Sequence, residues 1–134
     1  MEIKEFFKDD RYAAFSGIEL TEVQPGYAKA QMEIKEMHLN AANVVQGGAI
    51  FTLADLAFAA AVNAYGNLAV SIETSIRYFK GASSGTLYAE AKAIHLHKKL
   101  ATFQIEIKHD SGDLIALFTA TAFRKDISLP CDFK

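Results

Sequence analysis

The sequence predicts an α+β fold in which a strongly curved antiparallel sheet wraps around one long, apolar helix. A very apolar segment of helical length runs from about Ala49 to Tyr65, and four segments with alternating apolar and polar residues follow it. Alternation with a period of two is typical of a strand that is buried on one face. Because no other part of the chain could cover the apolar helix, the sheet must curve around it.

Size and composition indicate a single domain over residues 1–134, with its core at about 17–124. A chain of 134 residues, 51% of them hydrophobic, can bury a core, and no linker or internal repeat divides it. The formal net charge of −2 gives no field that would attract nucleic acid or an anionic membrane. We therefore expect neither partner, and any anionic ligand must be held by local contacts.

Three features favour a cytoplasmic protein. Cys131 is the only cysteine, so no disulfide can form within the chain. The N-terminal residues are partly acidic and lack the apolar run of a signal peptide. The longest hydrophobic stretch, Leu56 to Val62, is far shorter than the roughly 20 residues that span a bilayer.

The N-terminal part of the chain predicts a helix and at least one strand. Ile3, Phe6 and Phe7 stand at helical spacing, so a short amphipathic helix is expected within the first fifteen residues. From Gly26 onward, apolar and polar residues alternate through residues 28–34, which predicts a half-buried strand.

A polar connection over residues 35–48 leads into the long helix, and Gly66-Asn67 ends that helix. The four alternating segments that follow are expected to form consecutive hairpins, because short sequences rich in turn-forming or charged residues separate them. These segments lie at about 69–79, 86–97, 100–109 and 113–124.

A glycine pair, Gly47 and Gly48, stands at the start of the predicted helix. The first N–H groups of a helix have no intrahelical partner and carry the positive end of its dipole, and glycine lets a ligand approach them. A carbonyl oxygen that gains negative charge would fit there. The alternative is that the pair only permits a tight turn or a close helix-to-sheet contact.

Asp55 lies in the middle of this apolar helix, where a carboxylate needs a partner or a task. It follows Gly48 by seven residues, which is two helical turns and about 10 Å. A carbonyl carbon held at the glycine amides cannot also lie within ~3 Å of a carboxylate two turns away. If both serve one site, they come from different subunits related by a twofold axis. The alternative is a structural carboxylate that accepts loop amides.

Other polar residues carry weaker signals. Lys80, Lys98 and Lys99 fall near predicted strand ends, where they could meet ligand phosphates or simply be solvated. His95 and His97 share a strand face, but no third residue with ligand spacing accompanies them, so no metal site is predicted. The sequence contains no phosphate-binding glycine loop, dinucleotide fingerprint or nucleophilic serine motif.

The segment HLNAANVVQGGAIFTLADLA, residues 38–57, resembles the signature of PaaI-like hotdog-fold thioesterases, in the 4-hydroxybenzoyl-CoA thioesterase-like superfamily. That signature has an asparagine shortly before His-Gly-Gly and then a hydrophobic stretch ending in Leu-Ala-Asp. The resemblance extends over residues 17–124. It implies a hotdog fold and an acyl-CoA thioesterase that acts as a homodimer or as a dimer of dimers (a homotetramer), without a metal or another cofactor.

The resemblance also implies roles for single residues. The amide of Gly47 would polarise the thioester carbonyl, and Asp55, supplied across the dimer interface, would act as nucleophile or as general base. Asn40 would help to place the carbonyl or the water, and a hydroxyl on the strand after the helix, Ser71 or Thr74, would orient the water.

One position departs from the signature, because Gln46 replaces the histidine of the family. A glutamine amide can donate a hydrogen bond, but it cannot carry a proton through neutral pH. We expect Gln46 to position the substrate, and Gly48, Lys80 and Lys98 to contribute to substrate binding. The substitution leaves open a non-catalytic acyl-CoA-binding protein, and it disfavours a hotdog dehydratase. The acyl pocket has three candidate residues, which equally fit an ordinary core: Phe51, Phe58 and Tyr78.

Overall fold

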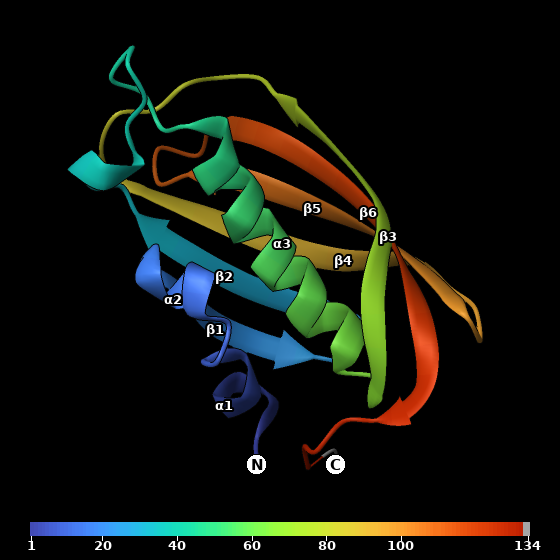
Figure 1. Ribbon diagram of the computed structural model, residues 1–134. Coiled ribbons are helices and arrows are strands. Elements are labelled where there is room, and N and C mark those ends of the chain that lie inside the picture. Colours follow the sequence, from blue (N-terminus) through green and yellow to red (C-terminus); the bar gives the residue numbers. More distant parts are fainter. Residues whose placement is uncertain (133–134) are drawn as a thin grey trace.

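The computed structural model describes residues 1–132 and confirms the predicted α+β architecture. One six-stranded antiparallel sheet curves around helix α3 (Gly47–Asn63), as Figure 1 shows. Helix α3 contacts all six strands, so it forms the centre of the core. Within residues 1–132, no helix is both long enough and apolar enough to cross a membrane.

Helix α3 is built from strong helix formers, chiefly alanine and leucine, and its apolar side chains cover most of its circumference. Phe58 is 1% exposed, and its ring packs on the rings of Phe103 and Phe118 at centroid distances of 5.5 and 6.5 Å. Phe51 packs edge-on against Phe118 at 5.1 Å. Phe58 is therefore a core residue, and Phe51 packs against the same aromatic cluster.

Both ends of α3 differ by two residues from the predicted ones: it begins at Gly47 and ends at Asn63. Asn63 is buried, and its side-chain amide donates to the carbonyl oxygen of Ala59 (2.8 Å). Its side-chain oxygen accepts the N–H of Ala69 (2.9 Å). The side chain thus ends the helix and ties it to the next strand, a contact that apolar periodicity does not reveal.

The sheet confirms all of the predicted strands and adds one before them. The strands are β1 (Ile18–Gln24), β2 (Tyr27–Glu33), β3 (Asn67–Tyr78), β4 (Thr86–Leu96), β5 (Leu100–His109) and β6 (Leu114–Ser128). Their spatial order is β1-β2-β4-β5-β6-β3. Strand β1 escaped the sequence analysis because it lies at the sheet edge and its inward and outward residues do not alternate regularly.

The prediction of consecutive hairpins after the helix was wrong for β3 and β4. Hairpins do join β4 to β5 and β5 to β6, but β3 pairs with β6, and β4 pairs with β2. An alternating pattern identifies a strand without naming its neighbour. Strand β4 pairs with β5 on one side and with β2 on the other. Strand β3 therefore lies beside β6, at the edge of the sheet opposite to β1.

The first fifteen residues form two short helices, α1 (Ile3–Phe7) and α2 (Arg11–Phe15), and not one. The carboxylate of Asp10 accepts the N–H of Ala13 (3.1 Å) and caps α2, so a new helix starts there. Both helices lie against α3 and β1 (Figure 1). Ala13 is buried in this contact.

Candidate active site

The loop that precedes α3 is held by its own hydrogen bonds. The side-chain oxygen of Asn40 accepts the N–H groups of Ala42 (2.9 Å) and Val44 (3.3 Å). The backbone N–H of Gln46 donates to the carbonyl oxygen of His38 (2.8 Å). The oxygen of Asn40 is therefore engaged within the loop, and its NH₂ group is the part that can reach a ligand.

His38, to which the sequence analysis assigned no role, anchors this loop to the N-terminal helices. Its side chain is 4% exposed, its Nδ1 accepts the N–H of Lys35 (2.9 Å), and its Nε2 lies 2.7 Å from the carbonyl oxygen of Ser16. Because a carbonyl only accepts, Nε2 carries the hydrogen. The buried imidazole therefore connects the loop to the end of α2, a role that its position in the sequence did not signal.

The glycine pair begins α3 with two free donors. Within residues 1–132, neither the Gly47 N–H nor the Gly48 N–H has a hydrogen-bond acceptor. The Gln46 side chain is exposed and lies over Gly48: a Cβ on Gly48 would approach its Oε1 to 2.7 Å. The turn thus presents two unpaired amides beside a side-chain amide, a suitable arrangement for a developing oxyanion.

Tyr78, the last residue of β3, contacts the same turn. Its hydroxyl donates to the carbonyl oxygen of Gly47 (2.9 Å). A Cβ on Gly47 would lie 3.0 Å from the Cζ and the hydroxyl oxygen of Tyr78. Of the three residues predicted to line an acyl pocket, Tyr78 is the one that borders a hollow at this turn.

Asp55 is half-buried on α3, and within residues 1–132 it has no hydrogen bond and no ion pair. Burial raises the pKa of this carboxyl group, and the nearby carboxylate of Asp10 raises it further. Within residues 1–132, Asp55 therefore does not act as a structural carboxylate that accepts loop amides. A carboxyl group with a raised pKa and no partner is well suited to accept a proton.

The two hydroxyl candidates share one face of β3. Ser71 pairs with Ala122 and Thr74 pairs with Ala120, and both alanines point into the core. Residues three apart in a regular strand would face opposite ways, but the register shifts between Ser71 and Glu73. The bulge therefore turns both hydroxyl side chains toward the α3 side of the sheet.

The two lysines lie at different ends of the sheet. Lys80 follows β3 and borders the glycine turn, and its Nζ pairs with the carboxylate of Asp113 (2.6 Å) on the surface. Lys98 lies in the β4–β5 hairpin, at the far end of β4 from the start of α3 (Figure 1). Within one protomer Lys98 is therefore remote from Gly47, and it can meet that site only from a second copy.

Two hollows flank the glycine turn. One, of about 320 Å³, lies between Gly47, Tyr78 and Lys80. The other, of about 460 Å³, lies between α2 and the loop and is bordered by Asn40 and Gln46. Volumes of this order suit a small-molecule ligand.

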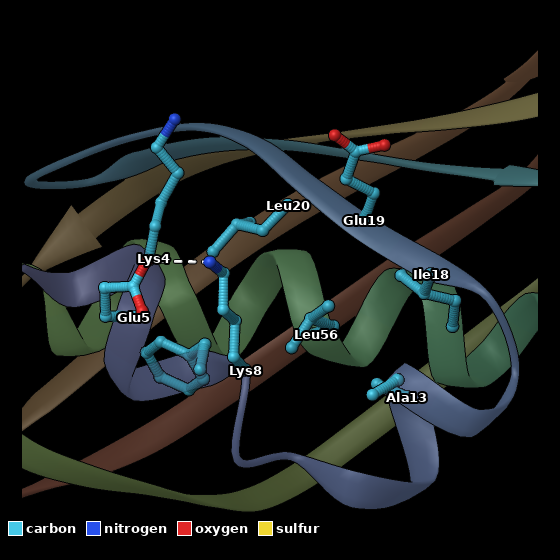
Figure 2. Close-up of a pocket in the computed structure, with 10 residues that line it drawn as sticks. Lys4, Glu5, Lys8, Ala13, Ile18, Glu19, Leu20 and Leu56 are labelled. Carbon is cyan, nitrogen blue, oxygen red and sulfur yellow. Dashed lines mark hydrogen bonds and ion pairs between the residues drawn. The ribbon is translucent and has the colours of Figure 1, made fainter.

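A third hollow, of about 390 Å³, lies beneath α1 and contains none of the predicted site residues. Figure 2 shows its apolar lining, which includes Leu20 and Leu56, and charged side chains around it. Two of these, Lys8 and Glu5, pair with each other (2.7 Å). We therefore assign the candidate site to the glycine turn.

Comparison with known proteins gives a consistent set of relatives. The sequence model of the thioesterase superfamily matches residues 42–116. The chain is 46% identical over 125 residues to a putative esterase of Archaeoglobus fulgidus, covering 92% of this chain and 81% of that protein. It is 32% identical over 119 residues to the acyl-coenzyme A thioesterase PaaI of Escherichia coli, covering 88% and 85%.

Solved structures agree with the predicted hotdog fold. The PaaI protein from the phenylacetic acid degradation operon of Escherichia coli superimposes with a TM-score of 0.89 and 30% identity, covering 92% of this chain and 91% of that one. A hypothetical thioesterase of Streptococcus pneumoniae, solved with coenzyme A, has a TM-score of 0.86 over 93% and 98% of the two chains. At 22% identity, this second likeness supports the fold alone.

Proposed function

Because the chain belongs to the thioesterase superfamily, we propose that it is an acyl-CoA thioesterase, which hydrolyses a CoA thioester to free CoA and a carboxylic acid. The observation that carries this proposal is the pair of amides at Gly47 and Gly48, combined with the Asp55 carboxylate on the same helix, all without partners within residues 1–132. Amides of this kind stabilise an oxyanion, and the carboxylate activates the water molecule that attacks the carbonyl carbon.

We propose that the site is completed by a second copy of the chain. Gly48 and Asp55 are seven residues apart on α3, which separates them by about 10 Å along the helix axis. One thioester carbon cannot touch both groups of one helix. Two α3 helices lying antiparallel across a twofold axis would bring each Asp55 to the glycine turn of its partner.

The free edge of β3 supports such a dimer. Within residues 1–132, β3 pairs on one side only, with β6. Its exposed residues include Val70 (39%) and Ile72 (59%), so the edge is both unpaired and partly apolar. An edge of this kind is a template for pairing with another strand. We therefore assign β3 to the interface of the homodimer, whether or not two dimers associate further.

In the proposed reaction, Asp55 of one subunit takes a proton from a water molecule, and the water oxygen attacks the thioester carbonyl carbon. The carbonyl oxygen becomes an oxyanion, which the Gly47 N–H stabilises, with the Gly48 N–H as the second donor of the turn. The C–S bond then breaks, the sulfur leaves as the CoA thiolate, and the proton returns to it. Direct attack by Asp55 on the carbonyl carbon, followed by hydrolysis of the resulting anhydride, is the alternative.

The other candidate residues position the reactants. Asn40 has its side-chain oxygen engaged in the loop, so we assign its NH₂ group as a donor to the substrate carbonyl. Gln46, exposed beside Gly48, donates a second hydrogen bond. Ser71 and Thr74 lie on the face of β3 that can orient the water. The lysine nearest to the turn, Lys80, would meet the CoA portion.

The test is thiol release from a panel of acyl-CoA thioesters, followed with a thiol reagent. We expect the wild-type protein to release thiol from at least one thioester. We expect Asp55→Asn, which keeps the size and polarity of the side chain, to lose at least about 100-fold in rate and to remain folded. Turnover by Asp55→Asn at the wild-type rate would remove Asp55 from this role.

A non-catalytic acyl-CoA-binding protein is the second candidate, and Gln46 in place of a histidine favours it. It predicts saturable binding of an acyl-CoA by the wild-type protein, with no thiol release over hours. The same panel therefore distinguishes the enzyme from the binding protein. The cytoplasmic location expected from the sequence stays a prediction.

A further inference from the structure

We infer that Tyr78 is a positioning residue for the amide site: by holding the Gly47 carbonyl, it fixes the direction in which the glycine turn presents its N–H groups. This inference rests on the proposed role of the turn in thioester hydrolysis. The geometry behind it is the hydrogen bond of 2.9 Å from the Tyr78 hydroxyl to the Gly47 carbonyl oxygen, which joins the end of β3 to the start of α3.

A glycine pair needs such a brace. The absence of a Cβ opens the amides to a ligand, but it also gives Gly47 and Gly48 more backbone freedom than any other residue type. An oxyanion donor contributes most when its direction is set before the reaction. A site built on two adjacent glycines at the start of a helix therefore gains from a further contact that limits this freedom.

Hydrogen bonds to their carbonyl groups hold the two peptide groups that flank Gly47. The group that carries the Gly47 N–H contains the Gln46 carbonyl, which accepts the N–H of Ala49 (3.0 Å) and of Ile50 (3.3 Å). The group that carries the Gly48 N–H contains the Gly47 carbonyl, which accepts the hydroxyl of Tyr78. The hydrogen bonds of the helix thus orient both amides, and the Tyr78 hydroxyl adds a side-chain contact that holds the second one.

The Tyr78 side chain is also matched to a glycine at position 47. Its Cζ and its hydroxyl oxygen would lie 3.0 Å from a Cβ on Gly47, so the phenol occupies the place of the missing side chain. Burial raises the pKa of the Tyr78 phenol, so the hydroxyl keeps its proton and remains a donor at neutral pH. The brace therefore persists where a thioesterase would work.

The test is Tyr78→Phe, which keeps the ring and removes only the hydroxyl. The matched control is Tyr88→Phe, because Tyr88 is 44% exposed on β4 and, within residues 1–132, its hydroxyl has no hydrogen bond. For Tyr78→Phe we expect kcat to fall about fivefold to tenfold, the value of one neutral hydrogen bond, while KM stays within about twofold. For Tyr88→Phe we expect neither constant to change.

A second measurement does not depend on activity. In ¹⁵N-labelled protein, we expect the order parameter of the Gly48 amide to fall from the rigid range, about 0.85, toward 0.6 in Tyr78→Phe. The Tyr88→Phe control should leave it unchanged. A change of stability alone would not lower the order of this one amide.

The two measurements distinguish failure of this inference from failure of the proposed function. An unchanged kcat with an unchanged Gly48 order parameter would overturn the inference, and so would a raised KM with an unchanged kcat, because Tyr78 would then bind substrate directly. If the wild-type protein releases no thiol from any acyl-CoA, the proposed function fails. The order parameter of Gly48 then decides by itself whether Tyr78 braces the turn.

Discussion

Mixing two inactive variants tests whether Asp55 and the glycine turn of one site come from different subunits. One variant, Asp55→Asn, keeps the amides and loses the carboxylate. The other, Gly47→Val, keeps the carboxylate and loses the turn, because its side chain would enter the space of the Tyr78 phenol, 3.0 Å from a Cβ. Each homodimer is expected to be inactive.

The recovered activity follows from the arrangement of the helices. Random exchange of equal amounts gives about one half heterodimers, each with two sites. One site combines the intact turn of one subunit with the intact Asp55 of the other, and the second site lacks both. About one quarter of the wild-type rate per protomer should therefore return, since about half of the sites in half of the dimers work.

Thiol release from one acyl-CoA measures the recovery, and native mass spectrometry confirms that the subunits have exchanged. Mixing wild-type protein with Asp55→Asn is the control, because exchange there leaves about half of all sites active, as simple dilution does. Confirmed exchange of the two inactive variants without recovery would refute a shared site. In that case Asp55 and Gly47 would have no common function.

Three further predictions test the surroundings of the site. Asp10→Asn removes a charge that raises the pKa of Asp55, and asparagine still caps α2. The acid limb of the pH–rate profile should therefore move to lower pH, and an unmoved limb would contradict an effect of Asp10 on Asp55. Asn63→Ala leaves a buried N–H and two carbonyls with one partner fewer, so urea unfolding should show a loss of about 2–4 kcal/mol. Ile72→Asp places a charge on the free edge of β3 (59% exposed) and should give a monomer without turnover in sedimentation and activity assays, whereas the equally exposed Ile94→Asp (58%) should change neither.

The sequence was sufficient for the elements that periodicity identifies. The apolar run over 49–65 and the four alternating segments correspond to α3 and to β3–β6. The same pattern did not identify the neighbours of each strand. The alternation of side chains in β4 is the same whether β3 or β2 pairs with its edge. Strand β1 was missed because, at the sheet edge, several of its residues are exposed on both faces.

At the candidate site, the sequence identified which residues to examine but not how they are connected. Gly47 and Asp55 were chosen for their spacing on one helix, which the structure retains. The contact from Tyr78 joins residues 31 positions apart, and the buried His38 bonds to Ser16, 22 positions away. No local pattern encodes such contacts, since they depend on how β3 and α2 pack around the loop.

The donors of the glycine turn in one protomer complement the Asp55 carboxylate of a second. Within residues 1–132, the turn at Gly47 and Gly48 has donors without acceptors, and Asp55 has an acceptor without donors. Gly48 is exposed and Gly47 and Asp55 are half-buried, so in one protomer these groups remain open to solvent and available to a ligand. Antiparallel association of two α3 helices would place each carboxylate opposite the amides of its partner. The groups that the described part of one copy leaves unpaired are thus the ones that two copies need to form a site.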